Sequence, residues 1–193
     1  MGCLLLLLPA EVGAATTQVG VHDRFFDADK VTVGVGDVVL WHNPGTQDAH
    51  NIRQDWTLFY SGDTVIEGDY KTTFSAGSFH YFCEIHGGRH SGMDGFVNVP
   101  VDTVAAPAGP TFTVKWAAST SKTGSRYDVQ YRVGTGAWQD WVKNTTKLKK
   151  EFGAGGSPAV SVPGTHYRFR ARSQKGSNNK AVSGWSPVSS FTP

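Results

Sequence analysis

One stretch of the sequence indicates the fold most clearly, Phe79-His80-Tyr81-Phe82-Cys83-Glu84-Ile85-His86. Successive side chains of a β-strand point to opposite faces, so Phe79, Tyr81 and Cys83 fall on one face. His80 and Phe82 fall on the other. The pattern predicts a strand that ends with Cys83 pointing into the protein.

The surrounding residues predict further strands joined by turns. Residues 30–41 are rich in valine and give two strands about a Gly-Asp turn. The tripeptide Asn43-Pro44-Gly45 ends that run and opens a loop that carries His50. Residues 95–99 form the last predicted strand of this region. Residues 16–100 are therefore expected to form a β-sandwich.

Four side chains around these strands predict a metal site. A polar loop before the last strand contains His86 and Met93, close in sequence to Cys83, and a second loop contains His50. A thiolate, two imidazoles and one thioether match a trigonal ligand set with a weak, long axial ligand. This set suits copper in both oxidation states, so the sequence indicates one-electron transfer.

These residues resemble the plastocyanin-like cupredoxins, small blue-copper domains, over about residues 17–100. The resemblance rests on the Trp and Asn within Val38 to Asn43, the His50-Asn51 pair, Gly77, Cys83, His86, Met93 and Gly95. It implies one type 1 copper held by His50, Cys83 and His86, with Met93 as the weak axial ligand. It further implies that Asn51 ties the two ligand loops together by hydrogen bonding. Six residues separate His86 from Met93, more than in many relatives, and His90 among them is an alternative axial ligand.

The same residues admit other interpretations. A buried cysteine near histidines can serve packing alone, because free cysteine is commonly buried. Zinc accepts a Cys/His₂ set, but a thioether is a poor zinc ligand. A Cys/His hydrolase is disfavoured because the cysteine is expected to face inward. His22, His42 and His80 are interpreted as surface or strand histidines.

The N-terminal residues and the cysteines indicate export. Residues 1–15 contain Leu4 to Leu8 and end in Gly-Ala-Ala, as a signal peptide with a truncated start would. The chain has two cysteines, and Cys3 lies in this leader. The mature chain would then keep a single thiol, which a bound metal would protect from oxidation. We expect a secreted or extracytoplasmic protein without a transmembrane segment.

Composition divides the chain into two units. Residues 101–110 are rich in proline and alanine and are expected to form a linker. Residues 16–100 carry 5 Lys and Arg against 11 Asp and Glu, whereas residues 101–193 carry 13 against 4. Opposite net charges favour two separately folded units with different partners.

Residues 111–193 predict a second sandwich. The inward positions expected on three strands are Phe112, Val114 and Trp116; Val129, Tyr131 and Val133; and Tyr167, Phe169 and Ala171. Trp116, the segment Pro163 to Tyr167 as a tyrosine corner and the segment Ser183 to Pro187 resemble a fibronectin type III domain. The likeness implies an anchoring or interaction module.

Alternation on one strand of this unit also predicts a basic stripe. Arg168, Arg170 and Arg172 point to one side, and Arg132 is expected on the same sheet. The arginines can stack on Trp185 by cation–π contacts, which is the favoured interpretation. They can alternatively hold the protein against an anionic polymer or membrane surface. Nucleic acid is not an expected partner.

The sequence thus predicts a carrier of single electrons rather than an enzyme, because four filled ligand positions leave no place for a substrate. The acidic first unit favours a redox protein partner with a basic docking face. Two alternatives stay open. The protein could store or deliver copper without redox duty, or it could be an extracellular interaction protein with a vestigial site.

Overall fold

The chain forms strands throughout the part described by the computed structural model, residues 13–106, 111–154, 161–176 and 181–193. Within these ranges the structure contains no helix, and hence none that could cross a membrane. The strands form four sheets arranged as two β-sandwiches, so the predicted all-β fold class is confirmed. Most of the predicted leader, including Cys3, lies outside the described residues.

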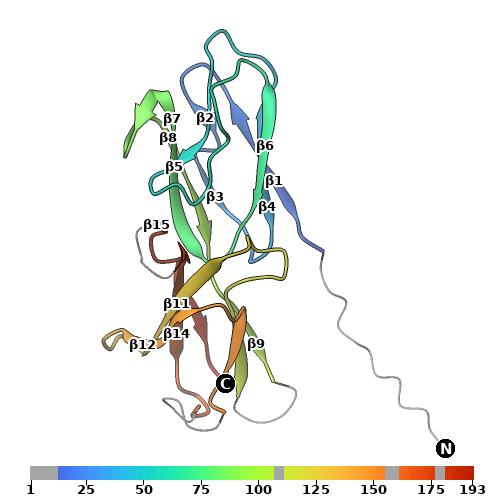
Figure 1. Ribbon diagram of the computed structural model, residues 1–193. Coiled ribbons are helices and arrows are strands. Elements are labelled where there is room, and N and C mark those ends of the chain that lie inside the picture. The colour runs from blue at the N-terminus through green and yellow to red at the C-terminus, as the bar shows by residue number, and fades with distance from the viewer. Residues whose placement is uncertain (1–12, 107–110, 155–160, 177–180) are drawn as a thin grey trace, which may run out of the picture.

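The first sandwich is built from two four-stranded sheets (Figure 1). One sheet has the order β2 (Phe26–Asp27), β1 (Thr16–Val21), β4 (Val38–Asn43) and β6 (Gly68–Thr73). The other has the order β3 (Lys30–Thr32), β8 (Ser91–Val99), β7 (Gly77–Gly88) and β5 (Arg53–Gln54). Each sheet contains one parallel pair, β1 with β4 and β3 with β8, while the other pairs are antiparallel.

Aromatic side chains fill the space between these two sheets. The inward face of β7 buries Phe79, Tyr81 and Cys83, as the alternation predicts. Trp41 of β4 is fully buried and meets Tyr81 edge-on, with ring centroids 5.1 Å apart. Because each buried aromatic ring removes a large apolar area from water, this cluster fixes the register of β7, the strand that carries the site.

The second sandwich packs a three-stranded sheet against a larger one. The first has the order β13 (Lys149–Phe152), β10 (Phe112–Lys115) and β9 (Asp102–Ala105). The second has the order β12 (Gln139–Thr145), β11 (Ser125–Val133), β14 (Tyr167–Lys175) and β15 (Ala181–Val182), with β16 (Ser189–Phe191) also on β14. Residues 102–105, expected in the linker, therefore form a strand, because they pair with β10. The end of that predicted linker, residues 107–110, lies outside the described residues.

The core of the second sandwich follows the predicted inward positions with one exception. The prediction for Val133 is wrong, because its side chain is 45% exposed. Val133 is the last residue of β11 and lies beyond the last pair with β12, Tyr131 with Gln139, so it is flanked by β14 alone. The other eight predicted positions are buried, and the hydroxyl of Tyr167 accepts a hydrogen bond from the backbone N–H of Val162 at 3.0 Å.

Three of the four arginines of the basic stripe, Arg132, Arg170 and Arg172, form a ladder with Trp138 and Trp185. The guanidinium of Arg170 lies between Trp138 and Trp185, 4.2 and 4.7 Å from their ring centroids. Arg172 stacks on Trp185 and Arg132 on Trp138. The favoured interpretation, cation–π stacking on Trp185, is confirmed, although Trp138 was not foreseen.

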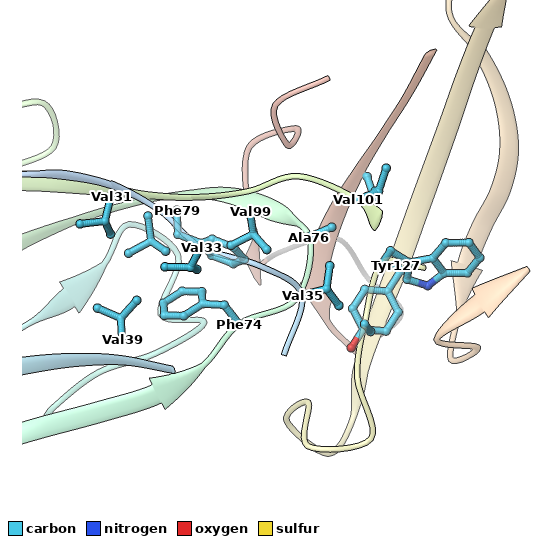
Figure 2. Packing of buried hydrophobic residues seen from close by; sticks show 14 of the residues in the cluster. Val31, Val33, Val35, Val39, Phe74, Ala76, Phe79, Val99, Val101 and Tyr127 are labelled. Atoms are coloured by element: carbon cyan, nitrogen blue, oxygen red, sulfur yellow. The ribbon is translucent and has the colours of Figure 1, made fainter. Parts of the chain in front are cut away.

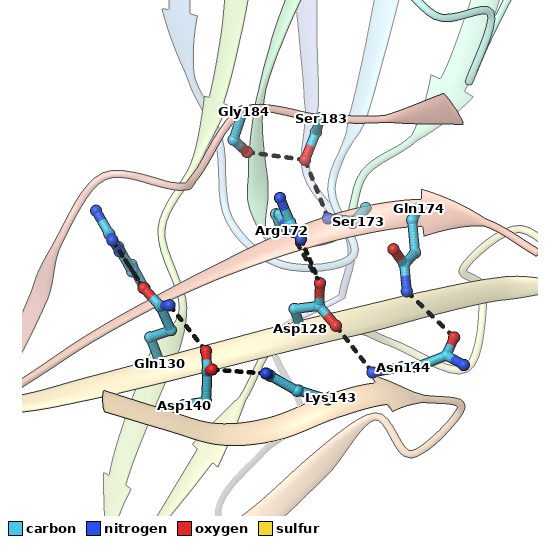
Figure 3. A network of polar contacts seen from close by, with 11 residues as sticks. Asp128, Gln130, Asp140, Lys143, Asn144, Arg172, Ser173, Gln174, Ser183 and Gly184 are labelled. Carbon is cyan, nitrogen blue, oxygen red and sulfur yellow. Dashed lines mark hydrogen bonds and ion pairs between the residues drawn. The ribbon is translucent and has the colours of Figure 1, made fainter. Parts of the chain in front are cut away.

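Hydrogen bonds anchor the arginine ladder to neighbouring strands (Figure 3). Asp128 of β11 accepts two bonds from Arg172 through one oxygen and one bond from Asn144 N–H through the other. Gln130 accepts from Arg170 and donates to Asp140. The guanidinium groups of Arg170 and Arg172 are thus used in internal contacts along the sheet.

The two sandwiches contact each other through buried backbone and side-chain groups. Ser78 of β7 and Gly184 exchange two backbone hydrogen bonds of 2.8 and 3.0 Å. The Ser173 hydroxyl donates to the carbonyl of Ala76 at 2.9 Å. Figure 2 shows the buried hydrophobic residues running from Val31 of the first sandwich to Tyr127 of the second without a break. The junction is therefore a packed core rather than a free linker.

Candidate metal centre

The candidate ligands lie in an irregularity of the β7–β8 hairpin. Regular pairing along the hairpin stops at Phe82 with Asp94 and resumes at Gly87 with Gly92. Four residues of β7, 83–86, therefore face a single residue of β8, Met93. Such a bulge bends the strand and re-aims its side chains. The predicted polar loop is thus a strand bulge, which turns Cys83 and His86 toward the same point.

Three donor atoms meet at this point. Cys83 Sγ lies 3.7 Å from both His50 Nδ1 and His86 Nδ1, and the two nitrogens are 3.2 Å apart. Metal–nitrogen and metal–sulfur bonds of about 2.0 and 2.3 Å in a trigonal plane separate the donors by about 3.5–3.7 Å. The observed triangle matches these separations closely, so the residues fit a single metal ion.

The triangle is shielded from water except at one edge. The exposed fraction of Cys83 is zero and that of His50 is 2%, whereas the His86 side chain is 9% exposed. Burial, reinforced by the nearby His86, lowers the pKa of His50 below its usual value. A neutral imidazole keeps a lone pair for a metal. The buried Nε2 of His50 has no hydrogen-bond partner among the described residues. No hydrogen bond at Nε2 therefore helps to orient the ring.

Glycines beside the bulge allow the strands to approach closely. Gly92 has φ +73°, and a Cβ there would lie 2.5 Å from the carbonyl oxygen of His86. A Cβ on Gly87 would lie 2.6 Å from the carbonyl oxygen of Met93. Neither position can accept a larger residue without moving the strand that carries a candidate ligand. Met93 itself is 1% exposed and lies opposite the bulge.

A hydrogen-bond network joins the His50 segment to the Cys83 segment. Asn51 Oδ1 accepts from the backbone N–H of Glu84 at 3.0 Å, and its amide donates to the Glu84 carboxylate at 2.7 Å. That carboxylate also accepts from Tyr60 and pairs with Arg53. Arg53 and Tyr60 were not foreseen, because a single sequence carries no signal for such a long-range contact.

The remaining histidines lie outside the triangle. His90 stacks on His80, with ring centroids 4.1 Å apart, and His80 points to the face of β7 opposite Cys83. The structure therefore places His90 away from the three donors. His80 is a strand histidine, as expected, but it is buried at 4% exposure. His42 is partly exposed and contacts Asp69 at 2.7 Å.

Comparisons with known proteins give structural neighbours only. No family model and no curated protein matches the chain. A purple cupredoxin from Nitrosopumilus maritimus is 23% identical, covering 42% of this chain and 97% of its own, with a TM-score of 0.37. Amicyanin from Paracoccus versutus is 28% identical over 48% of this chain and 84% of its own, with a TM-score of 0.36. A reduced Cu(I) amicyanin variant is 28% identical over 47% and 87%, with a TM-score of 0.35.

These solved structures are cupredoxins, and each covers about half of the chain. At such TM-scores the likeness assigns no chemistry to the protein. The chemistry of the centre follows from its own donor set.

Proposed function

We propose that this protein is an extracytoplasmic blue copper protein that carries single electrons. The proposal rests on one observation, the buried triangle of Cys83 Sγ, His50 Nδ1 and His86 Nδ1 with sides of 3.2–3.7 Å. One thiolate and two imidazoles in a trigonal arrangement suit copper in both of its common oxidation states. When bound there, copper would accept and release one electron.

The protein residues would make that exchange fast by holding the ligands still. Cys83 and His86 sit in one bulge whose two strands resume pairing beyond it, and Asn51 links this bulge to the His50 segment. Met93 would supply the weak axial thioether. A centre with fixed ligands needs little rearrangement between oxidation states, and its burial excludes water.

We infer a carrier role rather than catalysis. Three donors and the axial Met93 would fill the coordination sphere, whereas a catalytic metal keeps an open position. His86 is the one ligand whose side chain reaches the surface, at 9% exposure, so it would be the point of electron entry and exit. Asp48 lies 3.6 Å from His86 Nε2, but the same oxygen pairs with Arg24 at 3.1 Å. The support for a redox partner with a basic docking face is therefore the excess of acidic over basic residues in residues 16–100.

The second sandwich would act as a fibronectin type III module that anchors or positions the first. The three-stranded sheet facing a larger sheet and the hydrogen bond from Val162 N–H to the Tyr167 hydroxyl support this assignment. The arginine ladder is used in internal stacking, which weakens the alternative of an anionic polymer or membrane as its target.

Electron exchange tests the carrier function. Protein loaded with one equivalent of copper is immobilised on an electrode for voltammetry, and the self-exchange rate is measured by NMR line broadening. A reversible one-electron wave and fast self-exchange are expected. His50→Ala should abolish both, whereas His22→Ala, a histidine outside the triangle, should leave both intact.

Copper storage or delivery is the competing function, and it predicts the opposite kinetics. A storage site gives up its metal readily to a chelator and exchanges electrons slowly. Rapid transfer of copper to a chelator combined with an irreversible wave would therefore assign the site to storage. Retention of wild-type function by His50→Ala would point to a vestigial site.

A further inference from the structure

Three charged side chains from two loops lie near His86, the candidate ligand that reaches the surface. Asp23 and Arg24 belong to the turn between β1 and β2, and Asp48 lies two residues before His50. Asp48 Oδ2 lies 3.6 Å from His86 Nε2 and 3.1 Å from Arg24 Nη2. One carboxylate oxygen therefore faces both a candidate copper ligand and a cation.

Hydrogen bonds hold the loop that carries Asp48 in this position. Asp23 Oδ1 accepts the backbone N–H groups of Gln47 and Asp48, at 2.8 and 3.3 Å. The Thr46 hydroxyl donates to the backbone carbonyl of Asp48 at 2.8 Å. The backbone N–H of Thr46 donates to the carbonyl of Ile66, also at 2.8 Å. The backbone of Asp48 is thus fixed on both sides, and the fold determines where its carboxylate lies.

The electric field of these three side chains reaches the candidate metal centre. Burial, and after it His86, lowers the pKa of His50. The carboxylates of Asp23 and Asp48 act in the opposite direction, and the guanidinium of Arg24 lowers this pKa further. A carboxylate that favours positive charge on the imidazole also favours a more highly charged metal ion beside it, and a nearby cation disfavours that ion. The two signs of charge therefore act on the centre in opposite directions.

Asp48 is the more sheltered member of the ion pair with Arg24. The Asp48 side chain is 41% exposed, whereas the Arg24 side chain is 74% exposed. Water and salt ions screen an exposed charge more strongly than a partly buried one. The carboxylate should therefore act more strongly on the centre than the guanidinium, so that Arg24 offsets only part of the effect of Asp48.

We propose that Asp48 and Arg24 set the reduction potential of the centre from opposite directions, acting through His86. This inference rests on the proposed copper centre. One electron passes from the redox partner to Cu(II), giving Cu(I), and no bond or proton is exchanged. Because the oxidised ion carries the larger positive charge, a carboxylate beside its ligand stabilises it and lowers the potential, whereas a guanidinium raises the potential. Since the carboxylate is the more sheltered charge, the pair as a whole lowers the potential.

Voltammetry of the full chain loaded with copper tests this assignment. Asp48→Asn should raise the reduction potential, and Arg24→Gln should lower it. The double variant should lie between the two single variants, because their effects oppose each other. Asp48→Glu and Arg24→Lys are the matched controls, since each keeps its charge, and both should stay near the wild-type potential. High ionic strength should shrink the shifts of Asp48→Asn and Arg24→Gln, because both side chains contact solvent.

The results separate a failure of this inference from a failure of the copper centre. A wild type with neither a sulfur-to-copper band nor a reversible wave would overturn the copper centre, and this inference with it. If the wild type shows both, a potential of Asp48→Asn at or below the wild-type value, or of Arg24→Gln at or above it, would overturn this inference alone. Shifts that stay equally large at high salt would also overturn it, because a disturbed loop and not a charge would be their cause. If Asp48→Asn fails to fold, Arg24→Gln at its exposed position still decides the outcome.

Discussion

Asn51 holds Glu84 by two hydrogen bonds, from the Glu84 backbone N–H at 3.0 Å and to its carboxylate at 2.7 Å. Each of these residues directly follows a candidate ligand, so the pair fixes the spacing between His50 and Cys83. Asn51 is 2% exposed, and its loss would leave a partly buried N–H without its partner.

Asn51→Ala should lower the free energy of unfolding by about 1–3 kcal/mol, the cost of an unsatisfied buried group. It should also speed copper loss to a chelator, because the two ligand segments are no longer tied. Urea unfolding and stopped-flow absorbance measure these effects. Gln47→Ala, an exposed amide in the same segment, should stay within about 0.5 kcal/mol of wild type. Equal effects of the two variants would show that the Asn51–Glu84 link carries no stability.

Met93→Leu should raise the reduction potential and preserve the blue colour. A weak axial thioether donates electron density to the oxidised ion, and leucine removes this donor at similar volume. Voltammetry and visible absorption of the copper-loaded variant give the two readouts. Loss of colour in Met93→Leu would show that Met93 holds the metal rather than tuning it, and an unchanged potential would remove it from the axial position.

Gly36→Ala should destabilise the junction of the two sandwiches. Gly36 has φ +96°, and a Cβ there would lie 2.8 Å from the Cβ of Ala118 in the second sandwich. Gly45→Ala is the control. Gly45 has φ +115°, but no atom lies within 4 Å of the position a Cβ would take, so this variant introduces backbone strain without a steric clash. In urea unfolding, the free energy of unfolding of Gly36→Ala should fall by about 1–3 kcal/mol more than that of Gly45→Ala, because the added methyl overpacks the junction. Equal losses would mean that the junction is loosely packed.

Asp102→Asn should stabilise the protein at neutral pH. Burial raises the pKa of Asp102 above its usual value, against the opposing effect of Lys115 across the sheet. A carboxyl with a raised folded-state pKa contributes full stability below its unfolded pKa of about 3.9, and this contribution falls as pH rises through the folded pKa. The melting temperature of Asp102→Asn should therefore exceed that of wild type at pH 7 and converge with it near pH 3. If Asp102→Asn were less stable than the wild type at pH 7, the claim that the buried Asp102 carboxylate lowers stability at neutral pH would be wrong.

Local patterns in the sequence predicted much of the fold and of the donor set. The alternation through Phe79, Tyr81 and Cys83 determined which face of β7 is buried, because the side-chain period of a strand is fixed at two. The closeness of Cys83 to His86 in sequence likewise brought two of the three donors together.

The features that the sequence did not predict depend on contacts between distant segments. The bulge at residues 83–86 exists because β8 supplies only Met93 opposite four residues, and pairing register is not visible in one strand. His80 is buried because Asp55 and Asp94 approach it from two other segments. Val133 is exposed because it lies beyond the last pair of β11 with β12 and is flanked by β14 alone. Each outcome is set by a segment that is distant in the sequence.

Titration of the purified metal-free protein with Cu(II), followed by visible spectroscopy, tests the thiolate–copper centre most directly. We expect an intense sulfur-to-copper charge-transfer band that saturates at one equivalent and is absent from Cys83→Ser. Colourless binding by the wild type, or an unchanged band in Cys83→Ser, would contradict the assignment of Cys83, His50 and His86 to one copper ion.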